Sequence, residues 1–288
     1  MVARIASFVR KGRPTFGLVL DDNGLIDLGD PPHEGISSLA QALAAGQLEA
    51  MVARAVGREA DTALSEVELL PVVPAPAKIF CVGANFPSAS KPQTAKPPYP
   101  VIFTRFRDTL AAHGSPLAVP DRDQTLDFEG EVAVIVGRGG RNILQAEALA
   151  HVAGFTCFND ATVRSFQAHS HQFAPAKNFP ATAVVGPTMV MASDIENHLD
   201  LRITTRLNGT IVQDATLRDM IFSVAEIIAY CSSFTPLAPG DIIACGSPDG
   251  FGASRNPPLY LLPGDRIEVE VPPIGILANA VVGGLSRA

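Results

Sequence analysis

Residues 126–136 read Leu-Asp-Phe-Glu-Gly-Glu-Val-Ala-Val-Ile-Val, and this stretch decides how the chain is interpreted. Its apolar second half, residues 132–136, predicts a β-strand. Successive side chains of a strand point to opposite faces, so we expect Glu129 and Glu131 to point the same way. Carboxylates held that close repel each other unless a positive charge lies between them. The stretch therefore indicates a site that binds a cation.

A second apolar run supplies a third acid. Residues 152–158 read Val-Ala-Gly-Phe-Thr-Cys-Phe and are followed by Asn159 and Asp160. The run predicts a largely buried strand that ends at Asp160, where a lone acid requires a partner. Carboxylate oxygens suit Mg²⁺, Mn²⁺ or Ca²⁺ better than zinc. Glu129, Glu131 and Asp160 are thus candidate metal ligands, and the alternative is an ordinary solvated strand face.

The composition is that of an ordinary globular protein. The chain has 288 residues, 47% of them hydrophobic, which is enough for one large domain and a small one. A net charge of −7 and the lack of long Lys/Arg runs argue against nucleic acid as a partner. No run of about 18 apolar residues predicts a membrane span, and no signal peptide is recognisable, so the cytoplasm is the expected location. The four cysteines are widely spaced and are expected to be buried and reduced.

The chain divides at a Pro-rich segment. Residues 1–70 contain short alternating runs and one helical stretch at about residues 36–56, which predicts a small mixed domain. Residues 71–77 read Pro-Val-Val-Pro-Ala-Pro-Ala and are typical of a linker. From residue 78 to residue 288, strand-like runs alternate with Pro and Gly turns. Helices are expected there at residues 144–152 and 217–232. The expected fold class is α+β and rich in β-structure.

Six short motifs in the larger part resemble the fumarylacetoacetate hydrolase family and follow one another in that family's order. They are Lys78-Ile-Phe-Cys-Val-Gly-Ala-Asn85, Leu126-Asp-Phe-Glu-Gly-Glu-Val-Ala-Val134, Gly154-Phe-Thr-Cys-Phe-Asn-Asp160, Asn208-Gly, Pro239-Gly-Asp241 and Gly246-Ser-Pro-Asp-Gly250. Residues 1–70 resemble the family's accessory domain more weakly. The resemblance implies a rolled mixed β-sheet for residues 78–288, and a homodimer.

The resemblance also implies an enzyme with one Mg²⁺ or Mn²⁺ that acts on a small 2-oxo or 2,4-dioxo carboxylic acid. The family's metal ligands match Glu129, Glu131 and Asp160. Its active-site lysine matches Lys177, which would help to stabilise the enolate formed when a bond at C3 breaks. C–C bond hydrolysis of an acylpyruvate-type acid is the expected reaction. Decarboxylation, hydration and tautomerisation stay open, as does a non-catalytic relative that binds metal and keto acid.

Four further residues match positions near the substrate in the family. Arg164 and Gln167 match polar residues of the site, Arg105 stands where a lysine is common, and Ser247 where a threonine is common. Arg105 could pair with a substrate carboxylate through two hydrogen bonds. Arg164 is equally plausible as an ion-pair partner of the acids, and Gln167 as a surface amide.

The chain departs from the hydrolytic members of the family in the loop of residues 86–99. Those members carry a His-x-x-Glu pair there that activates water, and the matching residues here are Ala89 and Pro92. The loop contains no His, Asp or Glu, so it offers no general base. His171 lies close in sequence to the candidate ligands and lysine. It is the candidate substitute, with a plain exposed histidine as the alternative. The substrate and the preferred metal stay open.

Overall fold

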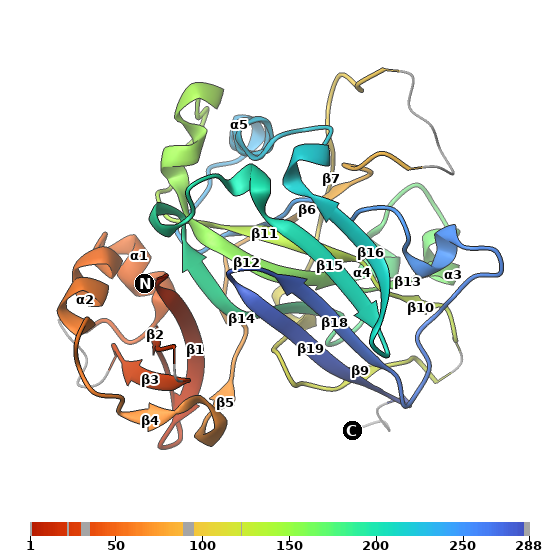
Figure 1. Ribbon diagram of the computed structural model, residues 1–288. Helices are drawn as coiled ribbons and strands as arrows, with labels where there is room; N and C mark the ends of the chain where they lie inside the picture. Colours follow the sequence, from red (N-terminus) through yellow and green to blue (C-terminus); the bar gives the residue numbers. More distant parts are fainter. Residues whose placement is uncertain (1, 22, 30–34, 89–94, 122, 285–288) are drawn as a thin grey trace.

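The large sheet of the molecule is built around β11 (Gly130–Val136) and β12 (Val152–Asp160), the two strands expected from the sequence. They pair antiparallel, with Glu131 opposite Phe158. The computed structural model describes residues 2–21, 23–29, 35–88, 95–121 and 123–284 (Figure 1). Strands dominate and helices are few, so the predicted α+β class, rich in β-structure and with a mixed sheet, is confirmed.

The other strands of the large sheet come from the N-terminal region and the middle of the chain, up to residue 244. They are β1 (Arg4–Arg10), β2 (Arg13–Val19), β3 (Gly24–Asp27), β4 (Thr62–Ala63), β5 (Glu68–Leu69), β6 (Ile79–Gly83), β7 (Val101–Thr104), β8 (Leu110–Ala111), β14 (Ala183–Met191) and β17 (Ile242–Ala244). The strand order is β4-β3-β2-β1-β14-β12-β11-β17-β6-β7, with β5 beside β1 and β8 beside β14. The pairs β17–β6 and β14–β8 are parallel, which makes the sheet mixed.

A second sheet packs against one face of β11 and β12 (Figure 1). Its order is β16-β15-β18-β19-β9. The strands are β9 (Leu117–Ala118), β15 (Arg202–Leu207), β16 (Thr210–Thr216), β18 (Arg266–Val271) and β19 (Gly275–Val282). A short antiparallel pair, β10 (Leu126–Asp127) with β13 (Thr162–Val163), lies next to the ends of β11 and β12 that carry the acids.

β11 is buried on both faces, which explains its uninterrupted apolar sequence. Val132 and Val134 belong to the larger apolar cluster, which lies between the two sheets. Ala133 and Ile135 belong to a second cluster, on the opposite face of the strand. Because side chains alternate, Glu131 continues the face of Ala133 and Ile135 toward the end of the strand. The acids therefore lie at the border of a packed apolar layer.

The helices of the structure are short. The α-helices are α1 (Leu39–Ala44), α2 (Leu48–Ala55), α3 (Arg164–Gln167), α4 (Ala174–Lys177) and α5 (Val224–Phe234). The 3₁₀ helices are η1 (Leu64–Glu66), η2 (Arg107–Thr109), η3 (Gln145–His151), η4 (Ala192–Asp194), η5 (His198–Asp200), η6 (Leu217–Asp219) and η7 (Gly252–Ser254). The single helix expected at residues 36–56 is wrong, because Gly46, at a φ of 64°, separates α1 from α2.

The helix expected at residues 217–232 begins later than predicted. The side chain of Ser223 accepts the N–H of Glu226, and the Glu226 carboxylate accepts the N–H of Ser223, so a capping box starts α5 at Val224. The preceding residues form the 3₁₀ helix η6 and then a bend, in which Ile221 and Phe222 donate their N–H groups to Asn85. The helix expected at residues 144–152 is the 3₁₀ helix η3.

The strands of residues 1–70 continue the large sheet. β1 pairs with β14 at Arg4 and Ile5, and in Figure 1 the first strands lie directly beside β14. Val72 and Val73 of the Pro-rich segment are buried, and the hydroxyl of Ser7 donates to the carbonyl of Val72 at 2.7 Å. The sheet thus runs across residues 71–77, and a division into two independent domains stays a prediction.

The cysteines and the helices can be compared with what the sequence predicts. All four cysteines are free and buried, as expected. None of the helices in the described residues is long and apolar enough to cross a membrane.

Candidate active site

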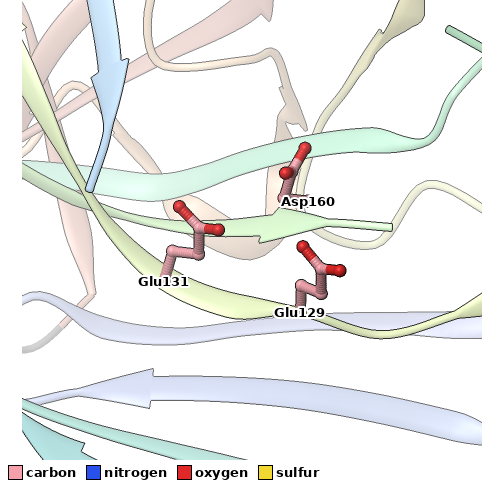
Figure 2. Close-up of side chains that lie close together, drawn as sticks. All are labelled: Glu129, Glu131 and Asp160. Carbon is pink, nitrogen blue, oxygen red and sulfur yellow. The ribbon is translucent and has the colours of Figure 1, made fainter. Parts of the chain in front are cut away.

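Glu129, Glu131 and Asp160 converge at the ends of β11 and β12 (Figure 2). One carboxylate oxygen of each lies within 4.8 Å of the others, and the three side chains point toward a common space. Glu131 and Asp160 are only 2% and 1% exposed, and Glu129 is partly buried. This burial excludes the alternative, an ordinary solvated strand face. The role of the three acids as metal ligands stays a prediction.

Lys177 lies between two of these carboxylates, at the end of α4. Its Nζ donates to Glu129 Oε2 at 2.6 Å, to Asp160 Oδ2 at 2.5 Å and to the Asp160 carbonyl at 3.0 Å. The side chain is 2% exposed. A buried ammonium is tolerated only when it is paired and hydrogen-bonded, and these carboxylates supply both. The ammonium group is thus fixed beside the space that the three acids enclose.

Arg105 lies beneath the cluster, and its guanidinium is bound entirely by the protein. Its Nε donates to Asp160 Oδ1, Nη1 donates to the carbonyl of Lys177 and to the Thr182 hydroxyl, and Nη2 donates to the carbonyl of Ala161. The side chain has no exposed surface. Direct pairing of Arg105 with a substrate carboxylate, one of the sequence-based predictions, would require these bonds to break. The geometry favours a role in orienting Asp160.

Replacing Arg105 by alanine should lower the free energy of unfolding by about 3–5 kcal/mol, because removing one member of a buried ion pair leaves the other charge uncompensated. Urea denaturation of the metal-free protein measures this change. Arg218→Ala is the control, since its pair with Asp200 is exposed on both sides, and it should cost less than about 1 kcal/mol. Native stability of Arg105→Ala together with a raised KM would instead support the substrate anchor.

Arg164 is an ion-pair partner of the acids, which is the alternative considered for it from the sequence. Its Nε donates to Asp127 Oδ2 at 2.7 Å, Nη2 lies 2.5 Å from Glu129 Oε1, and Nη1 donates to Gln167 Oε1 at 2.9 Å. The guanidinium also lies over the ring of Phe251, 4.7 Å from its centre. Gln167 therefore contacts the site through Arg164, and direct contact of either residue with a substrate stays a prediction.

Asp127 connects this arginine to the loop that contains Gly252. Its Oδ1 accepts the N–H of Gly252 at 2.6 Å and its Oδ2 accepts the N–H of Ala253 at 2.8 Å, in addition to Arg164. The carboxylate is fully buried. Burial raises the pKa of Asp127, and the nearby Arg164 offsets this only in part. Sequence reasoning did not select Asp127, because its hydrogen-bond partners are distant in the sequence and no local pattern indicates them.

Ser247 lies in the segment that follows β17, next to the acids. The preceding N–H, that of Gly246, donates to Glu131 Oε2 at 2.8 Å. The hydroxyl of Ser247 accepts a hydrogen bond from Gln213 Nε2 at 2.7 Å. Ser247 is partly exposed. The structure thus brings this predicted contact residue to the site, and Gln213 is a further residue that sequence reasoning missed.

The pKa values of two acids move in opposite directions. Burial raises the pKa of Glu131 well above its usual value, and the charges of Asp160 and Glu129 add to this shift. Burial acts on Asp160 as well, but Arg105 and Lys177 outweigh it and lower the pKa of Asp160. The difference follows from the partners, because ion pairs with cationic side chains are found for Glu129 and Asp160 but, within the described residues, not for Glu131.

This arrangement fits a bound divalent cation. The donor set consists of carboxylate oxygens, which Mg²⁺ and Mn²⁺ prefer. Glu131 is a buried carboxylate that accepts the N–H of Gly246, and the nearby charge of Lys177 offsets its burial only in part. A cation enclosed by the three acids would supply the missing positive charge. Glu129, Glu131 and Asp160 are the residues that would hold it.

His171 does not join this group. It lies between α3 and α4, is exposed, and within the described residues it makes no hydrogen bond or ion pair with the three acids or Lys177. The alternative of a plain exposed histidine fits this placement better than a general base. Ala89 and Pro92, the positions that correspond to the family's catalytic pair, lie outside the described residues.

Comparison with known proteins decides the family. Residues 78–282 match the family described as fumarylacetoacetate (FAA) hydrolase C-terminal. The chain belongs to the fumarylacetoacetate hydrolase family. The six motifs that suggested it lie within this matched range, and they carry the acids, Ser247 and the turn at Asn85.

Members of the fumarylacetoacetate hydrolase family that are similar to this chain differ in their named activities. An oxaloacetate tautomerase of Bacillus subtilis (strain 168) is 34% identical over 286 residues, which cover 92% of this chain and 95% of the relative. The structure of a fumarylacetoacetate hydrolase from psychrophilic Exiguobacterium antarcticum is 30% identical, covers 98% of this chain and 99% of its own, and has a TM-score of 0.83.

One solved structure of the family carries a metal. It is a maleylpyruvate hydrolase from Sphingobium sp. SYK-6, in complex with manganese(II) and pyruvate. It is 24% identical, covers 98% of this chain and 100% of its own, and has a TM-score of 0.81. At this identity the likeness concerns the fold. The fold of this chain is therefore one that both tautomerases and hydrolases of the family use.

Proposed function

We propose that the protein is a Mg²⁺- or Mn²⁺-dependent enzyme that stabilises the enolate of a small 2-oxo carboxylic acid, and that it interconverts the keto and enol forms of an acid such as oxaloacetate. The observation that carries the proposal is the Lys177 ammonium fixed against Glu129 and Asp160, beside the space that three carboxylates enclose. The similarity to an oxaloacetate tautomerase over 92% of the chain supports the choice of reaction.

The site residues suit a reaction in which negative charge develops on an oxygen. A Mg²⁺ or Mn²⁺ ion held by Glu129, Glu131 and Asp160 would supply a Lewis acid that favours the enolate. The three N–H groups of Lys177 already bind Glu129 and Asp160, so its contribution to the enolate would be that of a positive charge held in a fixed position beside the site. Burial of Lys177 and Asp160 keeps water away and strengthens these interactions. Keto–enol interconversion moves protons and consumes no water.

C–C bond hydrolysis, the reaction first expected from the sequence, is the second candidate. The similarity to the Exiguobacterium fumarylacetoacetate hydrolase favours it. Hydrolysis requires a group that activates water, and a positioned general base contributes about 10²- to 10⁴-fold. The loop with Ala89 and Pro92 contains no such residue, and His171 is exposed. We therefore rank hydrolysis below tautomerisation, with decarboxylation and hydration as variants.

A direct comparison of the two reactions tests the proposal. The purified protein is incubated with Mg²⁺ or Mn²⁺ and either oxaloacetate or an acylpyruvate such as fumarylpyruvate, while the enol absorbance is followed and the products are identified. We expect fast enol–keto interconversion of oxaloacetate, little cleavage, and no dependence on His171. Fast acylpyruvate cleavage that is lost in His171→Ala would establish the hydrolase instead. Binding of metal and keto acid without turnover would mean a non-catalytic relative.

The assembly and the location stay predictions. A homodimer is expected from the resemblance to the family, and sedimentation of the purified protein measures it. The cytoplasm is expected from the sequence, and fractionation of the source cells measures it.

A further inference from the structure

Gln213 on β16 connects the strand of the two glutamates with the segment of Ser247. Its side chain is 2% exposed, so the amide must find its partners inside the protein. Oε1 accepts the N–H of Gly130, which lies between Glu129 and Glu131, at 2.9 Å. Nε2 donates to the carbonyl of Pro248 and to the hydroxyl oxygen of Ser247, both at 2.7 Å. One amide thus joins two parts of the site.

Backbone groups decide which way this amide faces. The N–H of Gly130 can only donate, and the carbonyl of Pro248 can only accept. The amide oxygen therefore faces Gly130 and the amide nitrogen faces Pro248, whatever a side chain nearby would prefer. The second N–H of Nε2 then donates to Ser247. The reverse orientation would leave two buried groups unpaired, which is costly.

This orientation fixes the role of the Ser247 hydroxyl. A hydroxyl has one proton, and a hydroxyl oxygen that accepts from Gln213 directs that proton elsewhere. The carbonyl of Pro248, at 3.4 Å, is too far for a strong hydrogen bond. The N–H of Gly246 binds Glu131, so Ser247 lies beside the acidic cluster and is partly exposed. Its proton is available to a ligand there.

We propose that Gln213 is a positioning residue that sets Ser247 as a hydrogen-bond donor to an anionic oxygen of a bound oxo acid. The bond from Gln213 also polarises the hydroxyl and makes it a better donor. Enolate and carboxylate oxygens accept such a bond, and their negative charge strengthens it. The inference rests on the proposed function for the class of ligand, and it adds a residue that orients a donor toward an oxygen of that ligand.

A double-mutant cycle with a ligand that does not react tests this inference. The probe is oxalate, a small planar dianion, and its affinity is measured by calorimetry in the presence of Mg²⁺ for the unmodified protein, Ser247→Ala, Gln213→Met and the double variant. Ser247→Ala should weaken oxalate binding about 10-fold or more, since it loses a hydrogen bond to a charged group. Gln213→Met should weaken it as well, but by no more than Ser247→Ala does, because the hydroxyl is then no longer held as a donor. In the Ser247→Ala background, Gln213→Met should have no further effect. Ser247→Thr keeps the hydroxyl and should retain the affinity.

Two further measurements separate positioning from a structural role. Mg²⁺ affinity and the denaturation midpoint of each variant report whether the strand at Gly130 has moved. If Gln213→Met does not fold, Gln213→Glu keeps the bond to Gly130, and its added charge acts equally in both Ser247 backgrounds, so the cycle cancels it. A loss of oxalate affinity that is equal in both backgrounds would overturn the inference. So would full affinity in Ser247→Ala, or no oxalate binding by the unmodified protein.

The result of the double-mutant cycle with oxalate does not depend on whether the protein turns over a substrate. If the effect of Gln213→Met on oxalate affinity depends on Ser247 but the protein does not interconvert oxaloacetate, the proposed reaction is contradicted and the role of Gln213 stands. If the protein is an active tautomerase but the effects of Gln213→Met and Ser247→Ala on oxalate affinity are additive, only the role of Gln213 is overturned.

Discussion

Replacing Lys177 by methionine should lower turnover by about 10²-fold or more, while binding of Mg²⁺ persists. The loss of one preorganised positive charge beside a developing oxyanion has an effect of this order. Methionine resembles the apolar stem of lysine and lacks its charged group. Steady-state kinetics with oxaloacetate gives the turnover, and calorimetry with Mg²⁺ gives the metal affinity.

The same substitution should lower the free energy of unfolding of the metal-free protein more than that of the Mg²⁺-loaded protein. Without Lys177, Glu129 and Asp160 lose a shared cation, and a bound metal ion would replace part of that charge. Lys11→Met is the control, since Lys11 is exposed in the turn between β1 and β2 and should leave both turnover and stability unchanged. Near-native turnover in a folded Lys177→Met protein would assign the residue to structure alone.

Replacing Asp160 by asparagine should abolish the binding of one divalent cation and with it the activity. The change preserves the shape of the side chain, removes a ligand charge, and leaves Arg105 without its carboxylate partner. Calorimetry should show one site in the unmodified protein and none in the variant. Mg²⁺ dehydrates reluctantly and can bind weakly without a ligand, so the titration is repeated with Mn²⁺ and in the presence of oxalate.

Asp214→Asn provides the matched control for this experiment. Asp214 pairs with Arg202 on the exposed face of the second sheet, far in sequence from the acids, so metal binding should be unchanged. Unaltered binding in Asp160→Asn would remove Asp160 from the ligand set. Binding that is lost in both variants would indicate a general effect of charge.

The grouping of the acids could be predicted because it follows from local periodicity. Glu129 and Glu131 share a strand face through their spacing of two, and Asp160 ends a neighbouring apolar strand. Their burial was not predictable, since it depends on layers formed by distant segments. Apart from Arg105, the site residues that the sequence did suggest are near the acids in the chain or belong to short motifs of the family.

The placement of Arg105 shows where sequence reasoning ends. Its Nε reaches Asp160, 55 residues away, and its other partners come from residues 161–182. These contacts exist because β7 lies beside β6 and the segment before β14 folds back over it, and no local pattern encodes that arrangement. Gln213 and Asp127 were missed for the same reason. A buried polar side chain reads like any surface residue until its partners are known.

The helices were the least predictable elements. An apolar pattern placed a helix at residues 217–232, but the capping box at Ser223 and the bonds to Asn85 start α5 at Val224. Capping and tertiary hydrogen bonds override periodicity at helix ends.

The pairing of β1 with β14 has a consequence for the open edges of the large sheet. β14 is an apolar strand that is buried along nearly its whole length. If residues 1–70 were detached or folded late, the side of β14 that faces β1 would become an open edge with unpaired N–H and C=O groups. Such an edge invites strands from other molecules, and apolar side chains make the association persistent. Pairing with β1 thus covers this edge of β14 at Met189 and Val190, in the strand that lies beside β12 and Asp160.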